Sequence, residues 1–495
     1  MREEKCQIHL RHLRSILSAT FLLAVIAFCL HDYVANPQPD NQVLRYGYEL
    51  DVTARYGGLT DILLNVRKYP LLYAVPIAVL RVPLSLITDL RPGEIYPFTE
   101  PSIFLGRIYA FLYAGATFIV FSKLAKRLFG TDDAMALLQT SLMFFLFSSA
   151  VRPHIPVTCW TLLALLYSLR LRESHRTSDG CMAFGSALVA FCTLQNGLLA
   201  FIFPIWAFNA GHLGIRRTLQ TVGIVFVCLL LAVPLGYPFL LAPWFGHPGE
   251  FGFDLGHNAG SSLSFTHAFS LLGMMLGSDV FILLFAGIGL WRMWAGKDTY
   301  FPGCKVMLVY ITVYLLLFSF QTVADARFMM PILPMLVLIG ATAFARSPTW
   351  VQTVILSLFI IIFLKYSYLG FHNNTYQQTR DLLGSEVGTV GVIGGVPTYH
   401  YNFPISAMSE YTDDLRYVVS PALDMQGKEH MGWELCHRIV ASSMSDNDMF
   451  LWTEVPYALW YVLESRSLGP NINVYCRESP APHDLPGGMR ARNDT

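Results

Sequence analysis

Long apolar runs recur through the first 370 residues, and most of them approach the length of about 20 residues that a helix needs to cross a bilayer. In a chain of 495 residues, 54% are hydrophobic and only 14% are charged. Such a composition leaves too few polar side chains to cover a water-soluble domain, so the sequence predicts an all-α polytopic membrane protein. We expect about eleven transmembrane helices, at 15–31, 103–122, 134–150, 156–170, 181–194, 197–211, 219–241, 268–291, 305–320, 328–345 and 350–368. The pair within 181–211 has a second interpretation, one long and one re-entrant helix.

Basic residues cluster on every second connection between these runs, as the positive-inside rule requires of cytoplasmic loops. The clusters are Arg2, Lys5, Arg11 and Arg14; Lys123, Lys126 and Arg127; Arg170, Arg172 and Arg176; Arg216 and Arg217; Arg292, Lys297 and Lys305; and Arg346. This alternation places residues 1–14 in the cytoplasm and the first long loop, 32–102, outside. With eleven crossings, the tail at 370–495 also lies outside the membrane.

The first apolar run follows basic residues but lacks a small-residue cleavage site, which favours a retained anchor over a removed signal peptide. We therefore expect a membrane domain over residues 15–369 in a multi-pass protein. We expect it in the bacterial plasma membrane in preference to the endoplasmic reticulum.

The tail at 370–495 differs in composition, with turn formers and short β-type runs at Val390–Ile393, Tyr417–Val419, Met449–Trp452 and Ile472–Tyr475. Helical patterns alternate with these runs at 376–386 and 430–442. The pattern predicts a small extracytoplasmic α/β domain. Cys436 and Cys476 are the cysteines of this tail, and they pair if its compartment is oxidising; the sequence alone leaves the pairing open.

Two acidic residues of the first outer loop have positions suited to chemistry. Asp32 stands at the very end of the first apolar run, and Asp40 stands eight residues further on, in a proline-rich turn. A carboxylate at the mouth of a helix bundle can accept a proton from a hydroxyl or an amine while the reacting groups stay out of bulk water. The alternative role is to solvate an outer loop.

Four stretches resemble motifs of one enzyme family. They are Gln38-Pro39-Asp40-Asn41 with Lys68-Tyr69-Pro70-Leu71-Leu72-Tyr73; Gly106-Arg107 at the start of a span; Gly185 to Pro204, which contains Gln195-Asn196; and Arg327-Phe328-Met329-Met330-Pro331-Ile332-Leu333-Pro334. In these stretches, from about residue 15 to 370, the chain resembles polytopic glycosyltransferases of the C-class superfold (GT-C). The branch is the protein-mannosyltransferase-like and aminoarabinose-transferase-like one, which uses polyprenyl-phosphate sugars.

The resemblance implies a membrane enzyme that transfers a hexose or pentose from a polyprenyl-phosphate carrier to an extracytoplasmic lipid, glycan or protein. Asp40 would be the general base, with Asp32 as the second candidate. Lys68, Arg107, Arg152 and Arg327 would neutralise the lipid phosphate, with His154 as a hydrogen-bonding partner. Each cation can alternatively snorkel to headgroups. The chain departs from the family at Asn41, where relatives carry Glu; at Gln195-Asn196, where they carry a lysine-tyrosine pair; and at Arg152-Pro153-His154, where they often carry Asp.

Other classes of protein receive less support. Zero formal net charge argues against a nucleic-acid partner. Some members of the superfold use a divalent ion, so a metal site at His247, His257 and His267 is one interpretation. Their spacing of ten residues matches no ligand pattern, so the sequence does not support that site, and it indicates no other cofactor. A transporter or lipid flippase would also be polytopic, yet it would carry ionisable groups in mid-membrane and an internal repeat. An inactive relative that serves as a scaffold is a third possibility.

Overall fold

The computed structural model describes the chain in segments that together hold most of the helical part and the core of a small sheet. The described residues are 2–30, 70–72, 74–79, 100–148, 152–209, 215–238, 240–241, 265–319, 326–372, 375–383, 390–392, 406–407, 417–421, 433–440, 463–464, 466–467 and 471–477. They fall into two compact units. The first comprises Met1–His372 and Met449–Ser465, and the second Asn373–Asp448 and Arg466–Thr495.

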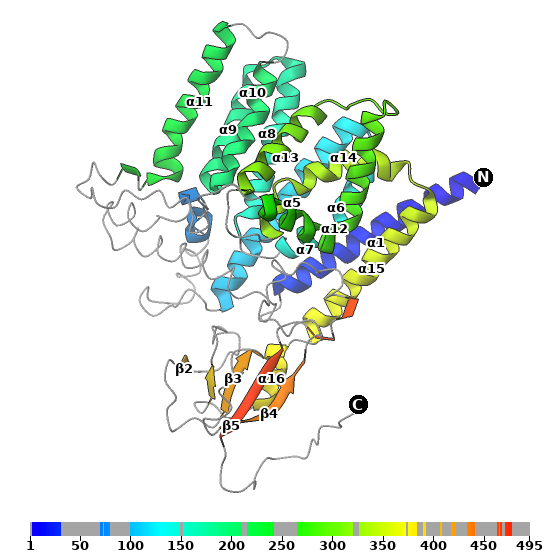
Figure 1. Ribbon diagram of the computed structural model, residues 1–495, viewed down its shortest axis with the longest axis vertical. Coiled ribbons are helices and arrows are strands. Elements are labelled where there is room, and N and C mark those ends of the chain that lie inside the picture. The colour runs from blue at the N-terminus through cyan, green and yellow to red at the C-terminus, as the bar shows by residue number, and fades with distance from the viewer. Residues whose placement is uncertain are drawn as a thin grey trace. The chain divides into compact units, whose positions relative to one another are not determined.

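The first unit is built of helices (Figure 1). Their bounds are α1 (Arg2–Leu30), α5 (Glu100–Phe129), α6 (Asp133–Gln139), α7 (Leu142–Phe147), α8 (His154–Ser174), α9 (Thr177–Thr193), η1 (Gln195–Phe201), α10 (Ile202–Phe208), α11 (Ile215–Gly236), α12 (Phe265–Trp294), α13 (Cys304–Phe318), η4 (Ala326–Met329), α14 (Leu333–Ala345) and α15 (Thr349–His372). Among the described residues, six helices are long and apolar enough to cross a membrane, and shorter apolar helices accompany them. The expected all-α polytopic class is confirmed, whereas the count of eleven crossings stays a prediction.

Two of the expected spans are not single helices. The run at 134–150 forms α6 and α7, separated at Thr140 and Ser141, because the Ser141 hydroxyl accepts a hydrogen bond from the backbone N–H of Phe144 and so starts a new helix. The run at 197–211 forms the 3₁₀ helix η1, which leads into the seven-residue helix α10. At Ser141, a polar residue inside an apolar run therefore separates two short helices where hydrophobicity alone predicts a single one.

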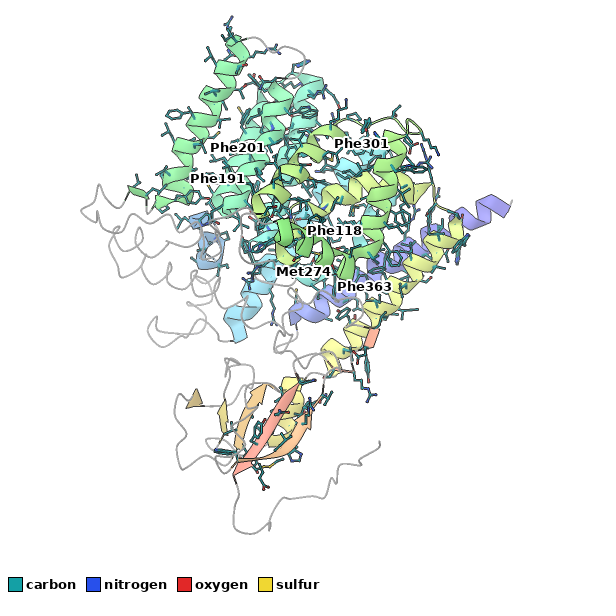
Figure 2. All side chains as sticks on the ribbon, viewed as in Figure 1. Phe118, Phe191, Phe201, Met274, Phe301 and Phe363 are labelled. Carbon is teal, nitrogen blue, oxygen red and sulfur yellow. A yellow bond between two sulfur atoms is a disulfide. The ribbon has the colours of Figure 1, made fainter. Side chains whose placement is uncertain are left out.

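The helix pair α1 and α15 packs side by side around an aromatic cluster (Figures 1 and 2). The ring of Phe21, 4% exposed, lies at its centre. Phe118 of α5 and Phe363 of α15, both labelled in Figure 2, approach that ring edge-on, with centroids 5.3 and 5.2 Å away. Edge-to-face aromatic pairs of this kind each add about 1 kcal/mol beyond the area they bury.

Helices α12 and α14 approach each other closely because glycines form their contact. A Cβ atom on Gly289 would lie 2.4 Å from the carbonyl oxygen of Ile339, and one on Gly340 would lie 2.9 Å from the backbone nitrogen of Ala286. Helices in membranes depend on such small residues, since there is no hydrophobic driving force to bring their backbones together.

Helices α5 and α8 run in the same direction, and two contacts fix their relative height. Arg127 forms an ion pair with Glu173, an offset of 46 residues, and Cys159 lies close enough to act electrostatically on Tyr113, which is again an offset of 46. The same offset places Arg107 of α5 level with the residues that open α8. This register matters for the site described below.

The second unit contains a five-stranded sheet with strand order β2-β1-β3-β5-β4 and the helix α16 (Thr375–Leu383). The strands are β1 (Val390–Val392), β2 (Ser406–Ala407), β3 (Tyr417–Pro421), β4 (Trp433–Ile439) and β5 (Ile472–Arg477). Strands β2, β1 and β3 are parallel, while β5 runs antiparallel to both β3 and β4. The predicted small α/β domain is confirmed; its extracytoplasmic location and the boundary at residue 370 stay predictions.

The sheet corrects one expectation and answers one open question. The helix expected at 430–442 is wrong: Trp433–Ile439 is a strand, because its backbone pairs with β5 along its length. Cys436 on β4 and Cys476 on β5 form a disulfide, with their Cα atoms 5.8 Å apart. The predicted run at 449–452 lies outside the described residues.

Candidate functional site

The start of α8 carries a histidine in an apolar setting. The helix begins at His154 directly after Pro153, and Pro156 follows in its first turn, where a missing N–H costs nothing. The His154 side chain is 4% exposed. Its ring lies between those of Phe147, at the end of α7, and Phe328 of η4, with centroid distances of 6.0 and 5.9 Å.

Two arginines flank this histidine. The Arg327 guanidinium lies 5.2 Å above the ring of Phe328, and Arg152 precedes His154 by two residues and is 7% exposed. Both guanidinium groups are close enough to act electrostatically on the His154 ring. The fold therefore brings together three of the predicted site residues from segments far apart in the sequence. We call Arg152, His154 and Arg327 the cationic cluster.

Arg107 lies at the same height in the bundle as this cluster. The α5–α8 register aligns it with Pro153, and its side chain is 5% exposed. The Cys29 thiol donates to the backbone carbonyl of Arg107, with 4.0 Å between sulfur and oxygen. The end of α1 therefore lies at the same height in the bundle. A guanidinium buried this far is stabilised only where polar or anionic groups surround it.

The polar atoms of His154 are available to a ligand. Within the described part of the chain, neither ring nitrogen has a hydrogen-bond partner, although both are buried. Buried polar atoms in native proteins almost always have a hydrogen-bond partner, either another protein group or an ordered water. The cationic cluster thus offers positive charge together with an imidazole that can donate to or accept from a bound group.

Asn196 and Tyr314 form a hydrogen-bonded pair beside Phe328, the residue next to Arg327 of the cluster, and the sequence indicated only one member of this pair. The Asn196 side-chain amide donates to the Tyr314 hydroxyl at 2.7 Å, and that hydroxyl donates to the carbonyl oxygen of Phe328 at 2.6 Å. Gln195-Asn196 had been noted as a departure from the family, but Tyr314 had not been singled out. No local pattern links residues 118 positions apart, so only the fold reveals the pair.

A buried carboxylate was missed. Asp279 stands in the middle of α12, is 1% exposed and interrupts the helical backbone with φ −129° and ψ 41°. Its oxygens accept from the backbone N–H groups of Leu142 and Met143 and from the Ser141 hydroxyl. A single acid within an apolar span was the available signal, since such residues are rarely incidental.

Asp32, Asp40 and Lys68 lie outside the described residues, as do His247, His257 and His267. Their predicted roles therefore stay predictions. Among the residues that are described, no group of three or more His, Cys, Asp or Glu side chains could hold a metal ion.

No protein-family model matches the chain, and no curated protein sequence matches it. Solved structures, in contrast, do match the fold of this chain. The crystal structure of ArnT from Cupriavidus metallidurans bound to undecaprenyl phosphate superposes with a TM-score of 0.52 at 11% identity, over 93% of this chain and 97% of that one. The apo state of the same protein gives 0.51 at 12% identity, with the same coverage.

The chain has the fold of ArnT. ArnT is an aminoarabinose transferase of the GT-C class, so the family resemblance drawn from the motifs is confirmed at the level of fold. The ArnT fold extends over nearly the whole chain and accounts for the multi-pass membrane architecture. At this identity the likeness concerns the fold, and the activity has to be argued from the site.

Proposed function

We propose that this protein is a membrane glycosyltransferase that takes a sugar from a polyprenyl-phosphate carrier and passes it to an extracytoplasmic acceptor. The observation that carries the proposal is the meeting of Arg152, His154 and Arg327 at one site in a chain with the ArnT fold. The structure of ArnT with undecaprenyl phosphate supports a lipid phosphate as the ligand of such a site.

The chemistry of the donor explains why cations are needed. In a polyprenyl-phosphate sugar the phosphodiester carries one negative charge, and cleavage of the bond between the anomeric carbon and the phosphate oxygen adds a second. Arg152 and Arg327 stabilise that developing charge, and His154 hydrogen-bonds a phosphate oxygen. Arg107, level with the cluster, and Lys68 of the first outer loop are the further phosphate ligands in this proposal.

The acceptor supplies the other half of the reaction. Its hydroxyl or amine attacks the anomeric carbon from the face opposite the phosphate, so the configuration inverts. Asp40 accepts the proton that the acceptor loses, and Asp32 is the second candidate for this base. Electrons thus pass from the acceptor atom to the anomeric carbon and from the broken bond to the phosphate oxygen.

The carboxylate assignment is tested with radiolabelled polyprenyl-phosphate sugars added to membranes that contain each variant. Asp40→Asn should lower transfer by about a thousandfold, because the reaction then lacks its base. Asp32→Asn should have a smaller effect. Transfer at the parent rate in both variants overturns the base assignment, and unchanged transfer in Asp40→Asn alone moves the role to Asp32.

The phosphate assignment needs a separate pair of variants. Arg327→Gln should reduce kcat/KM for the donor by about a hundredfold, as expected when one transition-state charge contact is lost. Arg346→Gln is the matched control, because Arg346 lies just after the far end of α14 and pairs with Asp298. Equal effects of the two substitutions contradict a specific role for Arg327.

A further inference from the structure

We propose that Tyr314 is a positioning residue that holds Arg327 at the cationic cluster through the backbone of η4, with Asn196 as its orienting partner. The consequence for phosphate binding rests on the proposed function. The hydrogen bond from the Tyr314 hydroxyl to the backbone of η4, which we call the tether, is a property of the fold. Nothing in the chemistry of the cluster requires Tyr314 to touch a substrate.

The segment that carries Arg327 has little structure of its own. η4 is a four-residue 3₁₀ helix, and the bonds that follow it run from Met330 N–H to the Arg327 carbonyl at 3.2 Å and from Ile332 N–H to the Met329 carbonyl at 3.1 Å. Short 3₁₀ turns have poor hydrogen-bond geometry and depend on external contacts. The Tyr314 hydroxyl, which donates to the Phe328 carbonyl at 2.6 Å, is such a contact.

Asn196 determines the direction of this bond. Its side-chain N–H group can only donate, so the Tyr314 oxygen accepts from it, and the hydroxyl proton remains for the Phe328 carbonyl. Hydrogen bonds in a chain polarise and strengthen one another. Gly197 allows Asn196 to reach this place, because a Cβ there would lie 2.2 Å from the carbonyl oxygen of Ala190.

The aromatic contacts around the tether are independent of the hydroxyl. The ring of Tyr314 packs against that of Phe318 in a tilted arrangement, with centroids 4.7 Å apart, and the Phe318 ring packs likewise against that of Phe328 at 4.9 Å. Tyr314→Phe keeps these ring contacts and removes only the hydroxyl that forms the tether. The Phe328 carbonyl and the Asn196 amide then lose their partner, and η4 is free to move Arg327 away from His154.

Tyr310→Phe provides the control. Tyr310 lies one turn earlier on α13, is as fully buried as Tyr314, and stacks on Phe203 at 5.0 Å. Among the described residues its hydroxyl has no hydrogen-bond partner by geometry. Both variants therefore lose one buried hydroxyl from the same helix face, and only one of them loses a bond to η4.

The first measurement is hydrogen exchange of the full chain in lipid nanodiscs, read on a peptide that covers residues 326–332. We expect Tyr314→Phe to speed exchange of this peptide about tenfold, as loss of one buried hydrogen bond allows, and Tyr310→Phe to leave it unchanged. Exchange that is unchanged in Tyr314→Phe, or equally faster in both variants, overturns the tether.

The second measurement asks whether the tether acts through Arg327, with undecaprenyl phosphate as the probe. Introduced into the parent chain, Tyr314→Phe should weaken binding of undecaprenyl phosphate about tenfold. Introduced into the Arg327→Gln variant, it should cause no further loss, since the two substitutions remove the same contact. Additive losses, or an unchanged affinity in Tyr314→Phe, overturn the link to Arg327. Faster exchange together with no binding by the parent chain leaves the tether standing and overturns the proposed function instead.

Discussion

The carboxylate of Asp279 accepts a hydrogen bond from the backbone N–H of Leu142, at a distance of 2.8 Å. This contact joins the middle of α12 to the first residue of α7, and α7 ends at Phe147, whose ring lies against His154. A backbone N–H at a helix start needs an acceptor, and in an apolar bundle no bulk water can supply one. Asp279 therefore stabilises the wall of the candidate site from the far end of a short helix.

Substitution of Asp279 should destabilise the protein according to the number of acceptors lost. Asp279→Ala leaves the N–H groups of Leu142 and Met143 without their acceptor, so we expect a loss of about 3 kcal/mol in the free energy of unfolding. Asp279→Asn keeps one oxygen and should lose about 1 kcal/mol. Unfolding titrations in mixed micelles measure both. Ser367→Ala is the control, because it removes a buried hydroxyl whose bond is to the Phe363 carbonyl of its own helix. Stability equal to the parent in Asp279→Ala contradicts the capping role.

The close approach of α12 and α14 makes a second prediction. Gly289→Ala would bring a methyl group 2.4 Å from the Ile339 carbonyl oxygen, so we expect the helices to separate and the free energy of unfolding to fall by about 3 kcal/mol. Gly287 lies two residues earlier on α12 with nothing within 4 Å of its would-be Cβ. Gly287→Ala should change stability by less than about 1 kcal/mol. Similar thermal midpoints for the two variants would argue against a glycine-dependent contact.

The disulfide between Cys436 and Cys476 should contribute substantially to the second unit. It closes a loop with a sequence separation of 40 residues, for which the chain-entropy account gives about 4 kcal/mol. In the double variant Cys436→Ser with Cys476→Ser, the sheet should therefore become sensitive to proteolysis at a lower denaturant concentration than in the parent. Cys181→Ser removes an exposed free thiol and is the control. Alkylation of Cys436 and Cys476 without prior reduction would contradict the pairing.

Two separate arguments predict an extracytoplasmic location for the second unit. Disulfides persist in oxidising compartments, and the alternation of basic loops places the tail outside with an odd number of crossings. Alkaline phosphatase fused after Thr495 should therefore be active, and a fusion to a reporter that folds only in the cytoplasm should not. The opposite result would place the disulfide-bonded sheet in the cytoplasm and require an even number of crossings.

Much of the fold was predictable because its cause is local. Apolar runs such as those of α5, α12 and α15 predicted helices, and β3 and β5 were visible as short β-type runs. The break at Ser141 was missed because it depends on one side-chain cap, not on average hydrophobicity. Strand β4 was mistaken for a helix because its conformation is set by pairing with β5, which a window along the sequence does not contain.

The site was predictable only in part. Arg327 is predicted from a family-like motif, whereas Arg152 and His154 are predicted from their position at a span end where the chain departs from the family. The fold brings the three residues together. The contacts of Asn196 with Tyr314 and of Asp279 with Leu142 join residues 118 and 137 positions apart. Such pairs are products of tertiary packing, so each residue alone resembled an ordinary buried side chain.

The most direct test of the proposed glycosyl transfer follows the carrier itself. The full chain is placed in proteoliposomes with a polyprenyl-phosphate sugar, labelled in both sugar and lipid, and a membrane extract as the source of acceptor. The proposed function predicts that the lipid label appears as free polyprenyl phosphate and the sugar label on the acceptor, with both signals about a hundredfold weaker in Arg327→Gln. Movement of the intact sugar-lipid across the membrane, with no release of polyprenyl phosphate, would contradict glycosyl transfer and identify a flippase.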